Sequence, residues 1–238
     1  MVPVMTYEPG MSAEEAERLR RWHERAYAES REEGDSGQTF EYLGLVLDVP
    51  ADVMPISRVS HLLGEAVVDE VKPNDRVLDM GTGSGVNAIL AARSAREVVA
   101  VDLNPSAVEA ARANAVRNGV ADRVDVRLSD VFASVDGWFD LIIFDPPFRW
   151  FAPRDRLEMA MTDENYRALT AFFTDVREFL TPTGRLLIFF GTSGDLAYLR
   201  SLATMAGFAM ETIATDHVVR ETHRVEYHVY RMTLETGP

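Results

Sequence analysis

Residues 76–85 read RVLDMGTGSG, and this stretch decides the fold. It begins with the apolar pair Val77 and Leu78 and ends with glycines at positions 81, 83 and 85. Alternate glycines let the backbone turn tightly and approach a bulky ligand where any side chain would clash. The helix that follows points its free N–H groups at the same place. The stretch therefore predicts a strand, a ligand-binding turn and a helix, whereas a tight turn without a ligand needs only one glycine.

Outward from this stretch, short apolar runs alternate with segments of helical period. The predicted strands are residues 77–78, 98–101, 124–128, 141–144 and 186–190, and the predicted helices are residues 86–94, 106–118, 163–180 and 195–206. This alternation indicates an α/β, Rossmann-like, mostly parallel sheet with helices on both faces. Residues 210–213 and 225–234 predict a terminal hairpin, which brings the sheet to seven strands and places an antiparallel C-terminal strand at or near one edge.

The N-terminal part has a different pattern. Residues 12–33 predict a charged helix that begins with the capping-box pair Ser12 and Glu15. It is either a peripheral helix or an arm that grips a substrate. Residues 39–49 predict a β-hairpin, and residues 57–71 predict a helix. We therefore expect an N-terminal helix and hairpin extension, residues 1–55, followed by a main domain, residues 56–238.

The composition excludes several kinds of chemistry. The chain has 238 residues, a formal net charge of −14 and no cysteine, which excludes disulfides, thiolate zinc sites and a cysteine nucleophile. The five histidines show no metal-ligand spacing. Neither a membrane span nor an N-terminal signal is evident, so we expect a cytoplasmic protein. The acid excess repels a polyanion, so we expect nucleic acid to bind only at a locally basic patch.

Ligands of an open parallel sheet bind beyond the carboxyl ends of the strands, where the strand order reverses. Asp102 follows the second predicted strand, where a carboxylate can accept both hydroxyls of a ribose or cap the next helix. Asp130 and Val131 follow the third strand and offer a carboxylate beside a backbone N–H. This pair suits the exocyclic amine and a ring nitrogen of adenine.

The sequence Asp145-Pro146-Pro147-Phe148 follows the fourth predicted strand. Two prolines remove two N–H donors and fix φ, which leaves a rigid loop with bare carbonyls beside a carboxylate and an aromatic ring. Such a loop can accept hydrogen bonds from an –NH2 group. Taken alone, it is equally well a strand end that prolines terminate, but its place in a glycine-loop domain favours a functional role.

In this order, the motifs resemble those of class I S-adenosylmethionine-dependent methyltransferases. Residues 145–148 resemble the Asn/Asp-Pro-Pro-aromatic motif of members that methylate amino or amide nitrogens. Within the family, residues 42–55 and the domain after them are most similar to the protein-glutamine methyltransferases that act on translation release factors. Those enzymes carry Asn-Pro-Pro-Tyr where this chain has Asp145 and Phe148, and an Arg-Pro-x-Thr-Glu segment where it has residues 56–60.

The resemblance implies S-adenosylmethionine as cofactor, no metal, and three sets of site residues. The implied cofactor-binding residues are Asp79, Gly81, Thr82, Gly83, Gly85, Asp102, Leu103, Asp130, Val131 and Asp145. The implied catalytic residues are Asp145, Pro146 and Phe148, and the implied substrate-binding residues are Pro147, Phe148, Arg149 and Trp150. Residues 148–156, with three aromatic rings and three arginines, form either an acceptor-binding loop or a cover for the edge of the core.

The implied reaction is methyl transfer to an amino or amide nitrogen of a protein side chain or a small molecule. An exocyclic amine of a nucleobase in RNA or DNA is the alternative acceptor, because the same motif suits such enzymes. A non-catalytic partner subunit and an NAD-dependent dehydrogenase are alternatives of another class. The intact glycines and residues 145–148 argue against the first, and Val86, where G-x-G-x-x-G requires glycine, argues against the second.

Overall fold

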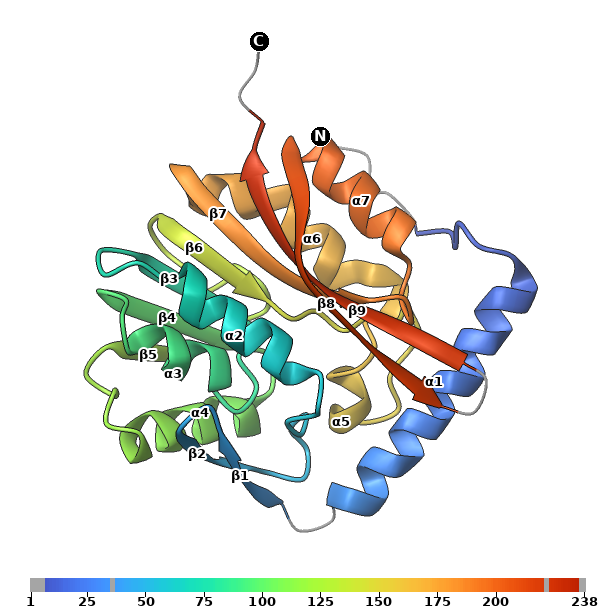
Figure 1. The fold of residues 1–238 in the computed structure, drawn as a ribbon, viewed down its shortest axis with the longest axis horizontal. Helices are drawn as coiled ribbons and strands as arrows, with labels where there is room; N and C mark the ends of the chain where they lie inside the picture. The colour runs from blue at the N-terminus through green and yellow to red at the C-terminus, as the bar shows by residue number, and fades with distance from the viewer. Residues whose placement is uncertain (1–6, 35–36, 221–222, 236–238) are drawn as a thin grey trace.

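The computed structural model describes residues 7–34, 37–220 and 223–235, and a seven-stranded sheet runs through its centre (Figure 1). The strand order is β5-β4-β3-β6-β7-β9-β8. The strands are β3 (Arg76–Met80), β4 (Glu97–Asp102), β5 (Val124–Leu128), β6 (Phe139–Phe144), β7 (Leu180–Gly191), β8 (Phe208–Arg220) and β9 (His223–Leu234). Strand β9 is antiparallel to both of its neighbours, while β3 to β7 pair in parallel. The predicted mostly parallel seven-stranded sheet is confirmed, with the antiparallel strand one place in from the edge.

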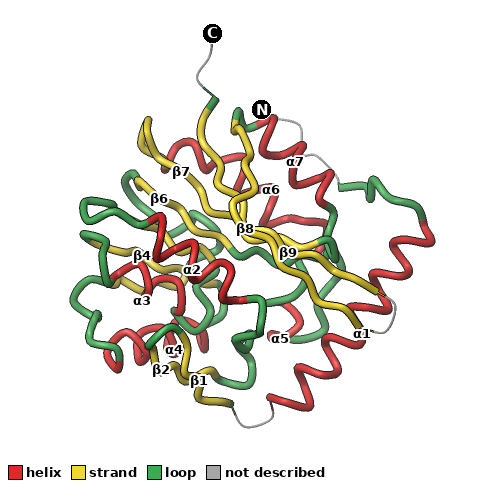
Figure 2. The backbone as a smooth tube through the Cα atoms, in the orientation of Figure 1, coloured by secondary structure: helices red, strands yellow, loops and turns green. Residues whose placement is uncertain are grey.

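Helices cover both faces of the sheet, as Figure 2 shows. The helices after the hairpin are α2 (Ser60–Glu70), α3 (Val86–Ala92), α4 (Pro105–Arg117), α5 (Arg156–Met159), α6 (Arg167–Asp175) and α7 (Leu196–Met205). Strand side chains alternate between the faces. Val77 thus packs in the cluster that includes α2, α3 and α4, and Leu78 packs in the cluster that includes α6 and α7. Nearly every parallel strand is buried on both sides, which explains the continuous apolar runs in the sequence.

The predicted helix over residues 163–180 is wrong in its extent. The structure divides this stretch into a 3-10 turn (Glu164–Tyr166), α6, a second 3-10 turn (Val176–Phe179) and the start of β7. Asn165 and Tyr166 have positive φ angles, 55° and 51°, which no continuous α-helix accommodates. Two further features differ from the prediction: β8 extends to Arg220 instead of ending at residue 213, and α5 is a short helix that the periodicity did not indicate.

The N-terminal extension packs on the sheet domain. Helix α1 (Ala13–Gly34) begins with the expected capping box, in which the Glu15 amide donates to Ser12 Oγ over 3.2 Å. Strands β1 (Gln38–Tyr42) and β2 (Leu45–Val49) form the predicted hairpin. The Asn114 side chain of α4 bonds both backbone polar groups of Asp48, at 2.9 and 2.8 Å. Because β2 also contributes to the core of the sheet, the division at residue 55 stays a prediction.

The strand order reverses between β3 and β6, since β4 and β5 lie beyond β3 and β7 lies beyond β6. Met80 pairs with Phe144 at the carboxyl ends of these two strands. The loops that follow, Gly81 onward and Asp145 onward, therefore start side by side at the switch point. Within the described ranges, no helix is long and apolar enough to cross a membrane.

Candidate active site

The glycine loop between β3 and α3 has a backbone that only glycine adopts easily. Gly81, Gly83 and Gly85 have φ angles of 68°, 55° and 86°. An added Cβ at Gly81 or Gly83 would meet one atom each within 4 Å, at 3.8 and 3.9 Å, so the space above this part of the loop is open. An added Cβ at Gly85 would lie 3.0 Å from the backbone of Ala111. Gly85 therefore serves the close packing of α3 on α4.

Asp79 supports the glycine loop from beneath. Its carboxylate is 1% exposed and accepts hydrogen bonds from Thr82 Oγ1 at 2.6 Å and the Ala88 amide at 3.0 Å. Burial raises the pKa of Asp79 to about 7, against the opposing effect of these bonds. The residue does not line the cavity described below. It holds the loop in shape, and the cofactor contact that the resemblance implied for it stays a prediction.

The carboxylate of Asp102, at the end of β4, faces the same loop. One oxygen accepts from the Gly83 amide at 2.8 Å and the other from the Asn104 amide at 2.8 Å. Burial raises the pKa of Asp102, and the backbone bonds oppose that rise. Asn104 caps α4, bonding the Ser106 amide at 3.1 Å. With the cap supplied by Asn104, Asp102 keeps lone pairs for a ligand's hydroxyl groups.

Asp130 and Val131 lie in the loop that follows β5, and both line the cavity described below. Asp130 makes a two-pronged ion pair with Arg167 of α6, with both N···O distances 3.0 Å. Both side chains are about half exposed, so the pair is weak, of order 0–1 kcal/mol. It connects the β5 loop to α6 across the cavity rim, a contact that the sequence did not predict.

The Asp145-Pro146-Pro147-Phe148 loop lies on the other side of the switch point. The Asp145 side chain is exposed and opens into the cavity. Partial desolvation by the protein groups that form the concave site, together with the nearby Asp79 carboxylate, raises the pKa of Asp145 to about 7. The Phe148 ring lies among three aromatic rings from β7 and β9, those of Phe189, Phe190 and Tyr227, at centroid distances of 5.6, 5.2 and 6.0 Å. The loop therefore presents a carboxylate and a fixed ring to one space.

A cavity of about 590 Å³ joins the two loops, a size typical of ligand pockets. Most predicted site residues line it, namely Gly81, Thr82, Gly83, Asp102, Leu103, Asp130, Val131, Asp145, Pro146, Pro147, Phe148 and Arg149. Asp79, Gly85 and Trp150 do not. Trp150 is 9% exposed and packs in the core against Tyr7 and Phe151, so its predicted contact with substrate is not supported by its position.

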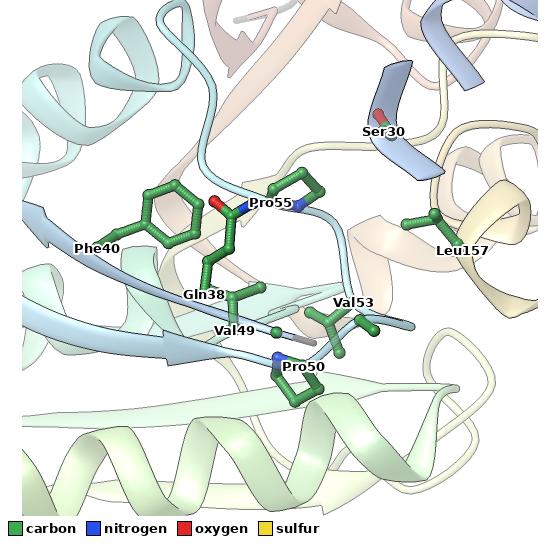
Figure 3. A pocket seen from close by; sticks show the side chains of 10 residues that line it. Ser30, Gln38, Phe40, Val49, Pro50, Val53, Pro55 and Leu157 are labelled. Carbon is green, nitrogen blue, oxygen red and sulfur yellow. The ribbon is translucent and has the colours of Figure 1, made fainter. Parts of the chain in front are cut away.

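The N-terminal extension forms one wall of this cavity. Trp22, Ala26, Glu29 and Ser30 of α1 and Phe40 of β1 all line it. Figure 3 shows Ser30 and side chains of the hairpin and of residues 50–55 around a separate small crevice. This crevice has a volume of about 10 Å³, which leaves room for one water at most. Helix α1 therefore contributes to the cavity wall, and a role as a substrate-gripping arm stays a prediction.

A buried hydrogen bond holds α1 in that place, and burial lowers the pKa of His23, so its imidazole is neutral at neutral pH. His23 Nε2 lies 2.7 Å from Glu158 Oε1, and both side chains are 2–3% exposed. Burial alone would raise the pKa of Glu158, but hydrogen bonds from Arg154 and His23 lower it to about 2. Arg154 also pairs with Glu24 of α1 at 3.0 Å. Helix periodicity gave no signal for these contacts, because their partners are more than 125 residues apart in the sequence.

Comparisons with known proteins agree with this geometry. The family model described as methyltransferase small domain matches residues 56–216, more than half of the chain. The chain belongs to this family. It is 36% identical over 158 residues to a release factor glutamine methyltransferase of Cereibacter sphaeroides, covering 61% of this chain and 56% of that protein. It is 43% identical over 79 residues to a ribosomal protein L11 methyltransferase of Desulfitobacterium hafniense, covering 33% and 25%.

The chain spans less than two thirds of the length of either relative. Among solved structures, Trm5 of Methanocaldococcus jannaschii in complex with adenosine has a TM-score of 0.62 and 17% identity, covering 85% of this chain and 57% of that one. At this level of sequence identity, the likeness shows that the two chains share a fold. The predicted family and fold, a class I S-adenosylmethionine-dependent methyltransferase, are confirmed.

The residues present fit S-adenosylmethionine. The open space above Gly81 and Gly83 admits a bulky group close to the backbone, and Asp102 suits the ribose hydroxyls. Leu103 and Val131 line the same end of the cavity. No group of three or more His, Cys, Asp or Glu side chains suited to a metal ion occurs in the part of the chain that the structure describes.

Proposed function

We propose that this protein transfers a methyl group from S-adenosylmethionine to an amino or amide nitrogen of a protein side chain. The observation that carries the proposal is the position of Asp145, which begins its loop next to the glycine loop and opens into the same cavity. A nitrogen bound at Asp145 and a cofactor bound at the glycine loop would therefore meet within one cavity. The relatives named above, which act on proteins by their names, support a protein acceptor.

When bound, S-adenosylmethionine supplies a methyl group that is already activated on a sulfonium sulfur. The chain's own task is then to hold the nitrogen in line with that group, and such alignment is worth about 7–11 kcal/mol of barrier. The Asp145 carboxylate and the Pro146 carbonyl would accept the two N–H hydrogens and so turn the nitrogen lone pair toward the methyl. The Phe148 ring would pack on the plane of the acceptor. A carboxylate is a stronger acceptor than an amide and also stabilises positive charge that develops on nitrogen.

A small-molecule acceptor and a nucleobase amine are the two competing substrates. The formal charge of −14 disfavours a nucleic acid, because a polyanion is repelled on average. We also propose a cytoplasmic location, since a chain without cysteine needs no oxidising compartment.

The test is transfer of radiolabelled methyl from S-adenosylmethionine into three separate pools. One is a synthetic peptide library whose members carry a single Gln, Asn or Lys, one is total RNA, and one is a metabolite extract. We expect label on side-chain nitrogens of peptides, and loss of labelling in Asp145→Ala with cofactor affinity retained. Label in RNA or metabolites alone, or no transfer in any pool, would refute the proposal.

A further inference from the structure

The segment between α5 and α6 holds the backbone just after Pro147. Three consecutive carbonyls, those of residues 148, 149 and 150, each accept a hydrogen bond from it. The donors are the Tyr166 hydroxyl to the Phe148 carbonyl at 2.5 Å, the Asp163 amide to that of Arg149 at 2.7 Å, and the Asn165 amide to that of Trp150 at 3.1 Å. Only the bond nearest the proline loop depends on a side chain, that of Tyr166.

Tyr166 lies in a strained position. It and Asn165 are consecutive non-glycine residues in the left-handed region, with φ of 51° and 55°. Each such residue costs about 1–3 kcal/mol and persists only where its surroundings hold it. The Tyr166 side chain is fully buried, among the rings of Tyr7, Trp150 and Tyr198 at centroid distances of 4.8 to 6.1 Å. Because its backbone is strained and its ring is completely buried, the Tyr166 side chain is held in one orientation.

A second hydrogen bond directs the Tyr166 hydroxyl. Its oxygen accepts the Asp195 amide at 2.8 Å, so its proton is available to the Phe148 carbonyl. The Asp195 carboxylate, 4% exposed, accepts the Tyr7 hydroxyl at 3.0 Å and the Gly10 amide at 3.2 Å. Burial raises the pKa of Tyr166, so the phenol remains a donor at neutral pH. A continuous buried chain of hydrogen bonds thus runs from the N-terminal segment to the proline loop.

The Phe148 carbonyl also has a close backbone neighbour, Gly194. A Cβ added to Gly194 would lie 2.2 Å from that oxygen, so the turn after β7 comes directly against it. The carbonyl is therefore held by contacts with both this turn and the Tyr166 hydroxyl. A change at Tyr166 would let the backbone of Phe148 move, and Phe148 is bonded directly to Pro147.

We propose that Tyr166 is a positioning residue, which sets the proline loop for methyl transfer through the Phe148 carbonyl, and that Tyr7 supports it through Asp195. This inference rests on the proposed function, because it assigns Asp145 and Phe148 to the acceptor. It also makes the segment from Tyr7 to Gly10 part of the support of the active site.

The test compares Tyr166→Phe with Tyr198→Phe. Tyr198 is a matched control, because its ring stacks on Tyr166 at 5.4 Å while its hydroxyl bonds Thr170 at 2.8 Å. The measurements are kcat and KM with the peptide that the wild-type enzyme methylates, the melting temperature, and hydrogen exchange of the peptide that covers residues 148–151. Tyr7→Phe is a milder second variant, which leaves the bond between Tyr166 and Phe148 in place.

We expect kcat of Tyr166→Phe to fall at least about tenfold, toward the roughly 100-fold that a 1 Å misplacement of reacting groups costs. KM for S-adenosylmethionine should stay the same, and residues 148–151 should exchange faster. Tyr7→Phe should show a smaller fall in kcat and a smaller rise in exchange. Tyr198→Phe should change neither. Equal kcat and equal exchange in Tyr166→Phe and Tyr198→Phe would overturn the inference. Faster exchange in Tyr166→Phe, with no methyl transfer by the wild type, would support the loop contact and refute the proposed function instead.

Discussion

The pH dependence of methyl transfer tests the role of the Asp145 carboxylate. Partial desolvation in the cavity and the Asp79 carboxylate raise the pKa of Asp145 to about 7. The ionised form is the stronger, charge-assisted acceptor and stabilises positive charge on the nitrogen, so kcat/KM should increase as the pH rises through that value. With a pKa of about 7, the ionised share goes from about 9% at pH 6 to about 91% at pH 8, and kcat/KM should therefore rise about tenfold.

The assay is the initial rate at subsaturating S-adenosylmethionine, because kcat/KM then reports the free enzyme. Asp145→Asn should transfer methyl more slowly and with no such rise. In the control Asp79→Asn, an amide oxygen can still accept from Thr82 and Ala88, so the loop is kept. Loss of that negative charge lowers the pKa of Asp145, and the midpoint should move to lower pH. A flat wild-type profile, or an equally steep rise in Asp145→Asn, would refute the reasoning.

Three further predictions concern the glycine loop, the α1 wall of the cavity, and Glu158, which bonds His23 of α1. Gly85→Ala should destabilise the fold by about 1–3 kcal/mol in urea unfolding, because of its positive φ and the contact with Ala111; an unchanged midpoint would contradict this. Ala26→Phe should raise KM for the acceptor without changing cofactor affinity, whereas Ala28→Phe on the exposed side of α1 should change neither. Glu158→Gln should cost about 1.5–3 kcal/mol near neutral pH, because it removes the carboxylate that Arg154 pairs with while its amide oxygen can still accept from the neutral His23. The wild type should lose this contribution as the pH falls from about 4.5, the ordinary glutamate value, toward 2, and a variant with wild-type stability at pH 7 would disprove it.

The sheet and the position of the site were predictable from local sequence. Apolar runs such as residues 141–144 are buried on both faces, so their strand character does not depend on distant partners. The glycines at 81 and 83 permit a turn with positive φ, and the prolines at 146 and 147 fix φ, both without help from distant partners. Their positions after β3 and β6 then bring them together, because parallel strands end at the same edge of the sheet.

The walls of the site were not predictable in this way. Tyr166 and Asn165 adopt left-handed backbone inside an apolar pattern of helical period, and only the tertiary contacts of Tyr166 explain that. The position of α1 depends on the pair of His23 and Glu158, 135 residues apart. Arg167 reaches Asp130 from another element in the same manner. Contacts of this kind join residues that are far apart in the sequence, so they produce no periodic pattern from which they could be predicted.

Calorimetric titration with S-adenosylmethionine tests the central claim most directly. The wild type should bind one equivalent, and Asp102→Ala should bind about 10- to 100-fold more weakly, since it loses charge-assisted hydrogen bonds to hydroxyl groups. Asp125→Ala, which removes an exposed carboxylate paired with Arg127 outside the cavity, should bind as the wild type does. Absence of binding by the wild type, or equal affinity of Asp102→Ala and Asp125→Ala, would contradict a methyl-donor site at the glycine loop.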